Sequence, residues 1–328
     1  MNSFGRKFKL SIFGESHGKS VGISIDGCPP GIELDESHFL KDLDRRRSGA
    51  KGTTPRLESD LPEIISGVFN GYTTGAPLTV VFKNEDTRSK DYSKLKEHPR
   101  PGHADFTAFK KYSGFNDYRG GGHFSARLTL GLVCAGVIAK KIVRPVDIEA
   151  KLISVHGSQN IELEIDNAIK NGESVGGIVQ CVAKNLPVGL GEPFFDSVES
   201  VISHLAFSIP AIKGIEFGSG FDAAKMYGSQ HNDLIINESG KTETNNAAGV
   251  NGGITNGNDL VFRIAVKPTS SIPKAQETYN LKTHKVEQLL IGGRHDVCVA
   301  LRVPVVLEAV TAVALADFIL LEGKEVFH

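Results

Sequence analysis

The sequence predicts an α+β fold in a single domain. Strand-like and helix-like segments follow one another without regular alternation, which favours α+β over a doubly wound parallel sheet. The segment 125–143 is apolar on nearly every side, which predicts a central helix that other elements bury. Residues 1–328 show no internal repeat, low-complexity tract or clear linker, and a chain of this length can bury a large core.

The individual elements follow from the spacing of apolar residues. Strands are predicted from alternating or β-branched runs near 6–13, 62–69, 77–83, 146–156, 176–185, 212–218, 232–237 and 259–266. Helices are predicted at 35–46, 103–112, 125–143, 162–171, 196–208 and 304–322. Asp35 and Ser125 are the expected N-caps of two of them, because a short polar side chain accepts a bond from a free N–H of the first turn.

Composition argues against several classes of protein. The 37 basic and 38 acidic side chains give a formal charge of −1, whereas dedicated nucleic-acid binders carry a clear basic excess. The N-terminal residues lack the apolar stretch of a signal peptide. The apolar segment 303–321 contains Pro304, Glu308 and Asp317, which favours a buried helix over a membrane span. Four isolated cysteines without a CxxC pair fit a reducing compartment. We expect a cytoplasmic protein without a metal site and without membrane or nucleic-acid partners.

Two loops present histidines beside glycine or proline. Ser16 and His17 lie between glycines after a predicted strand, where a ligand can approach closely and a histidine can transfer protons near neutral pH. The alternative is a turn with a surface histidine. In the segment 98–105, two prolines and a glycine hold Arg100 and His103 in a set geometry, and the alternative is a linker. The prolines interrupt the HxxxxH spacing, so this is not a helical metal pair.

Two arginine-containing segments are suited to anions. Adjacent helical residues are about 100° apart, so the arginines of 45–47 cannot share one face, and one of them can point into a site while another pairs with an aspartate. The alternative is a solvated charge run. In 119–127, three glycines lead into the buried helix, whose free N–H groups suit a phosphate or carboxylate. No Walker lysine follows, and the alternative is a flexible loop before a well-capped helix.

Three further segments complete the set of candidates. Residues 267–271 offer a lysine and three hydroxyls, and 292–296 place a carboxylate beside an arginine and a histidine. Each has a surface turn as its alternative. Residues 218–223 match GxGxxA, but too few residues follow for a crossover helix, so we reject a dinucleotide fold there. Together the candidates indicate a highly anionic small-molecule ligand and a phosphorylated cofactor.

The order of these motifs resembles the chorismate synthase family over essentially the whole chain. The matching segments are FGESHG (13–18), DLDRRRSG (42–49), RPGHAD (100–105), DYRGGGHFSAR (117–127), GLGEPFFD (189–196), GSQHND (228–233), GGITNG (252–257), KPTSS (267–271) and GGRHD (292–296). The resemblance implies a β-α-β sandwich, with a helical layer between antiparallel sheets, assembled as a homotetramer. It implies conversion of 5-enolpyruvylshikimate 3-phosphate to chorismate by anti-1,4-elimination of phosphate. That reaction depends on reduced FMN and involves no net redox change.

The resemblance also implies roles for individual residues. His17 would protonate the leaving phosphate, His103 would manage protonation at the reduced flavin, Asp296 would work beside the flavin N5, and Ser16 and Ser125 would relay protons. The substrate would be held by Arg47, Arg56, Arg100, Arg127 and Arg294. The FMN site would comprise His123, Phe124, Ser125, Pro210, Ala211, Gly252, Lys267, Pro268, Thr269, Ser270, Ser271 and Arg294. NADPH contacts would fall on Arg46 and Lys51.

The chain departs from the family pattern at a few positions. His123-Phe124-Ser125 stands where many members have Arg-Ser-Ser, and Pro210 stands where Asn is common, which removes a possible donor to FMN. Ser48 replaces a usual proline, and Lys51 replaces an arginine. Without a dinucleotide fingerprint, we expect an external reductant for the flavin. The competing functions are a phosphate-handling transferase and a non-catalytic anion-binding protein.

Overall fold

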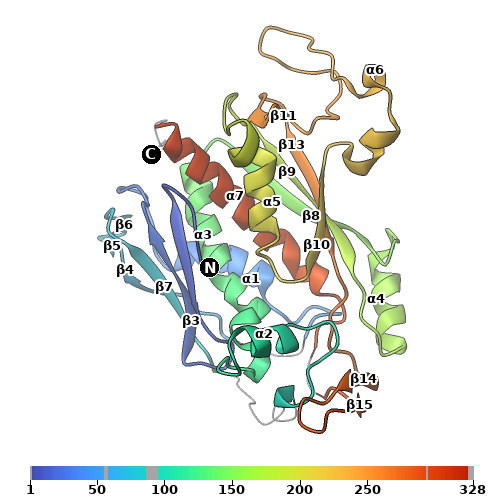
Figure 1. Ribbon diagram of the computed structural model, residues 1–328. Coiled ribbons are helices and arrows are strands. Elements are labelled where there is room, and N and C mark those ends of the chain that lie inside the picture. The colour runs from blue at the N-terminus through green and yellow to red at the C-terminus, as the bar shows by residue number, and fades with distance from the viewer. Residues whose placement is uncertain (1, 55–57, 86–94, 293–294, 324–328) are drawn as a thin grey trace.

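Two antiparallel sheets enclose a layer of helices in the computed structural model, which describes residues 2–54, 58–85, 95–292 and 295–323 (Figure 1). The first sheet has the order β1-β2-β3-β7-β4, and every neighbouring pair is antiparallel. Its strands are β1 (Ser3–Phe4), β2 (Lys9–Gly14), β3 (Ser20–Asp26), β7 (Leu78–Lys83) and β4 (Glu63–Ser66). Along β7 the buried side chains alternate, as Leu78, Val80 and Phe82, because one face of the sheet packs on the helices.

The second sheet lies on the other side of the helices. Its order is β10-β13-β9-β8, again antiparallel throughout. The strands are β10 (Ile212–Phe217), β13 (Leu260–Val266), β9 (Gly177–Lys184) and β8 (Asp147–Val155). In β13 every second residue from Leu260 to Val266 is buried, which is the pattern of a strand with one face on a core.

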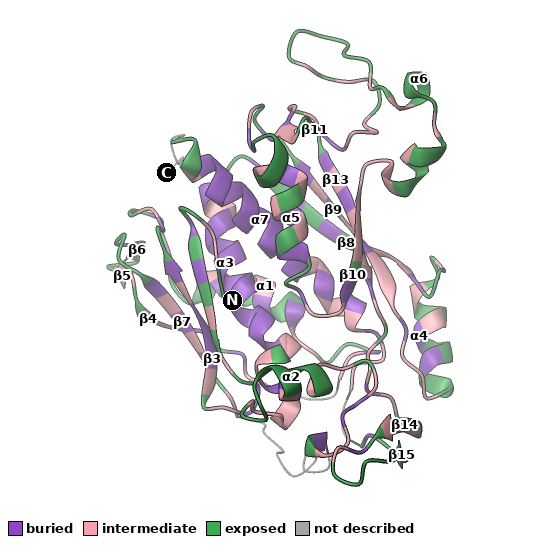
Figure 2. Ribbon diagram, in the orientation of Figure 1, coloured by how far each residue is buried: buried purple, intermediate pink, exposed green. Residues whose placement is uncertain are grey.

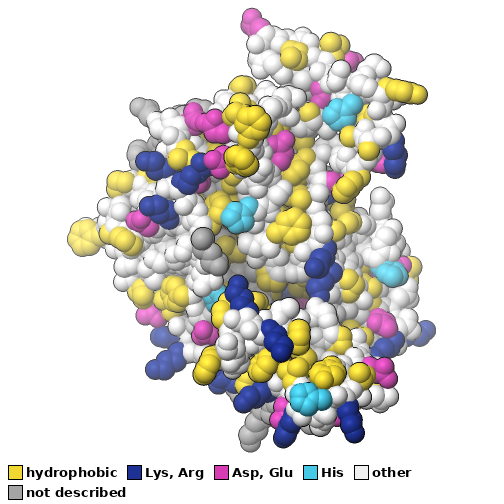
Figure 3. Space-filling model, viewed as in Figure 1, with side chains coloured by type: hydrophobic (Ala, Val, Ile, Leu, Met, Phe, Trp, Pro, Cys, Tyr) yellow, Lys and Arg dark blue, Asp and Glu magenta, His cyan; other side chains and the backbone are white. Residues whose placement is uncertain are grey.

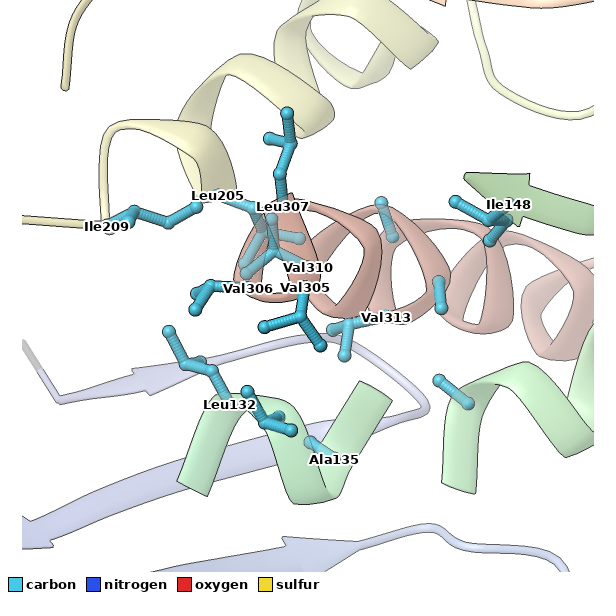
Figure 4. Packing of buried hydrophobic residues seen from close by; sticks show 14 of the residues in the cluster. Leu132, Ala135, Ile148, Leu205, Ile209, Val305, Val306, Leu307, Val310 and Val313 are labelled. Atoms are coloured by element: carbon cyan, nitrogen blue, oxygen red, sulfur yellow. The ribbon is translucent and has the colours of Figure 1, made fainter. Parts of the chain in front are cut away.

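The layer between the sheets is built around two long apolar helices, α3 (Thr129–Ile142) and α7 (Val303–Leu321). Both are buried on nearly all sides (Figure 2). They pack closely at Gly136, where a Cβ atom would come within 2.3 Å of the Cβ of Ala309. Leu132 and Ala135 of α3 face Val306 and Val310 of α7 in the core shown in Figure 4. The helices α1 (Ser37–Arg46) and α5 (Val198–Ala206) complete the layer.

Smaller elements connect and cover these layers. The remaining helices are α2 (Asp105–Lys111), α4 (Ile161–Lys170) and α6 (Gly228–His231). Short 3₁₀ helices occupy Arg119–Phe124, Ala126–Leu128, Phe194–Asp196, Gly220–Lys225 and Val299–Arg302. Three two-stranded hairpins are formed by β5 (Val68–Phe69) with β6 (Tyr72–Thr73), β11 (Val250–Asn251) with β12 (Ile254–Thr255), and β14 (Gln276–Tyr279) with β15 (Val286–Leu289).

The predicted fold class and the arrangement of a helical layer between antiparallel sheets are confirmed. Strand β3 was not predicted, because Gly22 interrupts its pattern. The glycine is needed there: a Cβ at position 22 would lie 2.6 Å from both the Phe13 ring and the Val80 carbonyl oxygen. The predicted strand 232–237 is wrong, since this segment holds an isolated bridge from Ile235 to Thr242. Its apolar residues have no neighbouring strand on which to pack.

The predicted caps differ in detail from those found. The N-cap position of α1 is Glu36, which makes no side-chain cap bond, and the Asp35 carboxylate accepts from the Ser37 N–H instead. Ser125 does cap a helix, since its hydroxyl accepts from the Arg127 N–H at 3.3 Å. The capped element is the short 3₁₀ helix that leads into α3.

Helix α7 is the buried core helix that its composition predicts, and its two carboxylates hold other parts of the chain. By length and apolar character, the segment Val299–Leu321 could also cross a membrane, but 89% of its most apolar window is buried inside the protein. Asp317 is 3% exposed and accepts from the N–H groups of Arg6, Lys7 and Phe8 at 2.7–3.1 Å. The N-terminal end of the first sheet is thereby fastened to the helix.

Glu308 ties α7 to three neighbouring elements. It is 2% exposed and accepts from Arg45 at 2.6 and 2.7 Å, from Lys140 at 2.9 Å and from the Ala150 N–H at 3.0 Å. Burial acts to raise the pKa of Glu308, but the bonds from Arg45 and the charge of Lys140 outweigh it, so the pKa is lowered. The carboxylate therefore stabilises the folded state above the pKa of an unfolded glutamate, and this contribution is lost as the pH falls through the lower folded pKa.

We expect Glu308→Gln to reduce the free energy of unfolding by about 1–3 kcal/mol at neutral pH, because a buried acceptor of charge-assisted bonds is removed. The difference in the free energy of unfolding between variant and parent should shrink as the pH falls below the pKa of an unfolded glutamate. Urea unfolding at a series of pH values measures both effects. Glu149→Gln is the control, since Glu149 pairs with Lys151 at the surface. An equal loss in both variants would contradict the assigned role.

Candidate functional site

A cavity of about 760 Å³ opens beside the start of α3 and the ends of α1 and α5. The face shown in Figure 3 is hollowed near its middle, above α2. The wall of the cavity combines segments that are far apart in the sequence: residues 2–4, 46–54, 58–60, 100–104, 120–129, 204–213, 267–271 and 295–302. A volume in the range of about 300–1,000 Å³ is typical of sites that enclose small molecules or cofactors.

A glycine loop forms one wall of the cavity. Gly120, Gly121 and Gly122 all have positive φ, at 58°, 82° and 53°, which side chains rarely tolerate. A Cβ atom on Gly120 would lie 2.7 Å from two atoms of the His17 ring and 2.9 Å from the Ser16 hydroxyl. The backbone of Gly120 therefore lies directly on these two buried side chains, and His17 is placed immediately behind the cavity wall.

Two buried arginines share one carboxylate at the inner end of the cavity. Asp60 accepts from Arg46 at 3.2 Å and from Arg127 at 2.7 Å, and all three residues are at least 94% buried. Burial and the nearby charge of Arg302 lower the pKa of Arg46 to about 9. Arg46 also donates to the hydroxyl of Thr129 and to the Ala126 carbonyl, so it holds the start of α3.

Asp296 lies on the wall beside this cluster. Its carboxylate accepts from the Thr54 N–H at 2.9 Å and from Arg302 at 3.4 Å. The Nε of Arg302 donates to the Arg46 carbonyl at 2.8 Å, which links the two groups. Arg302 was not among the predicted site residues, because it stands alone at the start of an apolar helix. The one feature of the sequence that could have indicated Arg302 is its position six residues after the predicted site residue Asp296.

Another part of the cavity wall carries two lysines. Lys267 donates to the Gly102 carbonyl at 2.8 Å and to the Ser270 hydroxyl at 2.6 Å. Burial, together with the nearby charge of Lys213, lowers the pKa of Lys267. Two neighbouring cations with hydroxyl groups suit a phosphate. Lys213, which sequence reasoning missed, is exposed and lies where the register of β10 shifts.

Most of the residues expected from the family resemblance meet at this cavity. Those on its wall are Arg46, Arg100, His103, His123, Phe124, Ser125, Arg127, Pro210, Ala211, Lys267, Pro268, Thr269, Ser270, Ser271 and Asp296. Further wall residues that the sequence did not indicate are Glu58, Asp60, His204, Lys213 and Arg302, and His295 of the predicted segment 292–296 lies on the wall as well. Burial lowers the pKa of His295, which favours its neutral form.

A few expected site residues lie elsewhere. Arg47 does not line the cavity, and it donates to the Ser59 carbonyl at 2.8 Å and pairs with Asp44. Lys51 is exposed and pairs with Asp166 of α4, so it is separate from the buried Arg46. Gly252 lies between β11 and β12, at the other end of the molecule in Figure 1. Arg56 and Arg294 fall outside the described residues. Within the described part of the chain, no group of three His, Cys, Asp or Glu residues could hold a metal ion.

Comparisons with known proteins agree in pointing to one family. The family model described as chorismate synthase matches residues 8–320. The chain is 66% identical to the chorismate synthase of Chitinophaga pinensis, covering 99% of this chain and 98% of that protein. It is 44% identical to the chorismate synthase of Pyrococcus abyssi, covering 96% and 97%. A crystal structure of a chorismate synthase superposes with a TM-score of 0.74 at 27% identity, covering 99% of this chain and 95% of the other.

We expect Gly120→Ala to destabilise the protein more than Gly71→Ala does. Both glycines have positive φ, so alanine costs about 1–2 kcal/mol at either position, but nothing lies within 4 Å of a Cβ at Gly71. At position 120 the new methyl group also collides with the His17 ring. Urea unfolding gives the difference, and hydrogen exchange at the imidazole C2 of His17 shows whether the ring moves. Equal losses with an unchanged ring would disprove this contact.

Proposed function

The chain belongs to the chorismate synthase family, and we propose that the cavity beside the glycine loop is where it performs the family's reaction. Chorismate synthase eliminates phosphate from 5-enolpyruvylshikimate 3-phosphate in an anti-1,4 sense, which gives chorismate in the last step of the shikimate pathway. The enzyme is a carbon–oxygen lyase, and its substrate is a small molecule with two carboxylates and a phosphate. The observation that carries the proposal is the convergence of Arg100, Arg127 and His103 on one cavity, with His17 directly behind its wall.

The arginines are suited to the three anionic groups of the substrate. Arg100 and Arg127 are each 6% exposed, so bonds to them would be little screened by water. Arg127 is engaged by Asp60, by the Asn84 side chain and by the Lys83 carbonyl, so substrate binding there involves exchange of partners. The Nε of Arg47 is buried and has no hydrogen-bond partner among the described residues. We assign Arg47, Arg56 and Arg294 to the same task by family resemblance.

The cavity also fits the reduced flavin that the family requires, which we propose is FMN. The wall offers a glycine loop whose backbone a ring can approach, the hydroxyl-rich segment 267–271, and the lysines 213 and 267 for a phosphate. Thr269 also supports a ligand here, since its hydroxyl is buried and has no hydrogen-bond partner among the described residues. His123, Phe124, Pro210 and Ala211 would complete the site, with Gly252 added by resemblance. What such a cofactor supplies when bound is transient electron donation without net redox change.

The chain's own groups are placed for the proton transfers. We assign His17 as the acid for the leaving phosphate, because its ring lies behind a backbone position that carries no side chain. Ser16, next to it, and Ser125, on the cavity wall, can relay protons. Asp296 is fixed by Arg302 and by the Thr54 N–H, which holds a carboxylate at the wall as a proton acceptor. His103 is assigned to protonation at the flavin.

We expect His17→Ala to lower phosphate release by about 10²–10⁴-fold, the usual span for a general acid. The assay is anaerobic incubation of the protein with reduced FMN and 5-enolpyruvylshikimate 3-phosphate, with phosphate and chorismate both measured. His156→Ala, at an exposed position after β8 and outside the matching segments, is the control, and we expect it to retain parent activity. Unchanged turnover in His17→Ala would remove this residue from the mechanism. If the parent forms neither product, the lyase assignment fails, and a transferase or anion-binding role takes its place.

We further propose that the flavin is reduced by an external donor. The two residues expected to contact NADPH do not share a surface: Arg46 is 3% exposed and bonded to Asp60, whereas the side chain of Lys51 is 62% exposed and pairs with Asp166. The GxGxxA match at 218–223 leads into a short 3₁₀ helix beside an antiparallel sheet, unlike a dinucleotide-binding crossover.

The expected result is that NADPH does not reduce FMN when mixed anaerobically with the purified protein. Loss of the visible absorbance of oxidised FMN reports the reduction, with dithionite as the positive control. NADPH-dependent bleaching that requires the protein would contradict the external-donor proposal, and it would leave the lyase assignment intact.

We also propose that residues 1–328 form one domain that assembles as a cytoplasmic homotetramer. The support is a set of exposed apolar side chains away from the cavity wall, which are typical of interfaces. They are Phe194 and Phe195, at 86% and 93% exposure, and Phe221, Tyr227, Leu234, Ile235 and Ile236, at 53–80%. The latter five lie in the extended segment at the top of Figure 1.

A further inference from the structure

Asp105 is a nearly buried carboxylate beside the cavity to which the proposed reaction gives no task. It is the first residue of α2, and its side chain is 8% exposed. One oxygen, Oδ2, accepts from the N–H of Arg100 at 3.0 Å and from its Nε at 2.7 Å. The other, Oδ1, accepts from the Nη2 of Arg100 at 2.8 Å and lies 2.6 Å from the Nδ1 of His103.

These contacts do not belong to ordinary helix capping. The N-cap position of α2 is Ala104, and no side chain caps the helix. The Asp105 carboxylate turns back along the chain to Arg100 and His103 instead of toward the free N–H groups of its own helix. Burial acts to raise the pKa of Asp105, but the bonds from Arg100 and His103 hold it well below its usual range. The group is therefore a fixed anion between two residues that line the cavity.

The surroundings of the imidazole determine where its proton lies. Nδ1 is 3.0 Å from Nη2 of Arg100 and 2.6 Å from the carboxylate oxygen. A guanidinium only donates, so it cannot accept a proton from Nδ1, whereas the carboxylate only accepts. A guanidinium N–H could also donate to an unprotonated Nδ1, but an unprotonated nitrogen and a carboxylate oxygen would repel each other at 2.6 Å, and this contact is the shorter of the two. Asp105 therefore favours the Nδ1–H form of the neutral ring, in which Nε2 is the acceptor.

The acceptor nitrogen faces the glycine loop. A Cβ atom built on Gly121 would lie 3.6 Å from Nε2 and 3.5 Å from Cε1 of His103, and 3.9 Å from the Cβ of Ser125. Gly120, which precedes Gly121 in the chain, and Ser125, which lies near it in space, both line the cavity. The loop that contains His103 is also held by the segment 267–271, because Ser270 and Lys267 donate to the Gly102 carbonyl. The ring is thus held at Nδ1 by Asp105 and Arg100, and its Nε2 side lies against the glycine loop.

We propose that Asp105 is a positioning residue of this enzyme: it holds His103 as the Nδ1–H tautomer with Nε2 toward the glycine loop, while both of its oxygens align the guanidinium of Arg100. Its effect on turnover rests on the proposed role of His103, whereas the tautomer does not. Arg100 donates from Nη1 to the Ser271 hydroxyl at 3.2 Å, so the same carboxylate also couples the loop 98–105 to the segment 267–271.

The first test uses the full-length protein without cofactor. Nitrogen-15 spectra of labelled histidine distinguish the two neutral tautomers, and His103→Gln assigns the signal of His103. The parent protein, followed to a pH at which the ring is neutral, should show protonated Nδ1 and unprotonated Nε2. Asp105→Asn should give mixed tautomers, because its amide replaces an acceptor oxygen with a donor. A parent ring protonated on Nε2 overturns the proposal, even if the variant does not fold.

The second test measures turnover of the holoenzyme with reduced FMN. Asp105→Asn should lower kcat by about 10–100-fold, the span seen for carboxylates that orient a functional histidine. The double variant with His103→Ala should lose less kcat than the product of the two single losses, since the part of the effect that acts through His103 is absent there and only the part through Arg100 remains. Asp26→Asn, a surface partner of Lys9, is the control. Asp105→Glu, which keeps the charge, should recover part of the loss.

The two tests separate the possible failures. Losses that multiply fully in the double variant would show that no part of the effect of Asp105 passes through His103, and the proposal would then be wrong. A parent protein without lyase activity would overturn the proposed function, while the nitrogen-15 spectra would still decide whether Asp105 fixes the ring.

Discussion

The shared carboxylate of Asp60 is the interaction on which the cavity depends. Arg46 and Arg127 are both buried, and two buried cations at the same end of a helical layer would repel each other without a common anion. Asp60 therefore connects the C-terminal end of α1 to the start of α3. Through the Lys83 carbonyl and the Asn84 side chain, Arg127 extends the connection to the end of β7. The wall that this network supports is the one that carries the glycine loop.

The same two helices, α3 and α7, build the apolar layer and border the charged cavity, which lies at their N-terminal ends. Helices α3 and α7 bury almost all of their side chains, which stabilises the layer, and at the cavity their first N–H groups donate to carbonyls of the 3₁₀ helices that precede them. Charged residues that enter this layer are each matched, as Glu308 is by Arg45 and Lys140. Among the described residues, Lys213 and Lys267 on the cavity wall form no ion pair with a carboxylate, and we propose that an anionic ligand supplies the partner.

Much of the site could be predicted from the sequence because its chemistry is local. The glycine run 120–122, the histidines 17 and 103, and the lysine-hydroxyl segment 267–271 each carry their signal within a few residues, and the structure brings them to one cavity. Strand β3 was missed because Gly22 interrupts its pattern. Asp60, Lys213 and Arg302 were missed because their neighbours in the sequence do not mark them as site residues, and Asp60 gains its role from Arg46 and Arg127, which other segments supply. The strand predicted at 232–237 failed for the converse reason, since an apolar run without a neighbouring strand cannot form a sheet.

The sequence by itself determined the fold class, the family and the types of chemical group at the site. It also determined that three consecutive arginines must point in different directions, because helical residues are separated by a fixed angle. Only the tertiary structure decided which direction each one takes. Arg45 reaches Glu308, Arg46 reaches Asp60, and Arg47 reaches the Ser59 carbonyl, so that of the three Arg46 lines the cavity. The reason is physical: a buried guanidinium is stable only where the fold supplies a carboxylate or carbonyl within hydrogen-bond distance, and those partners come from distant segments.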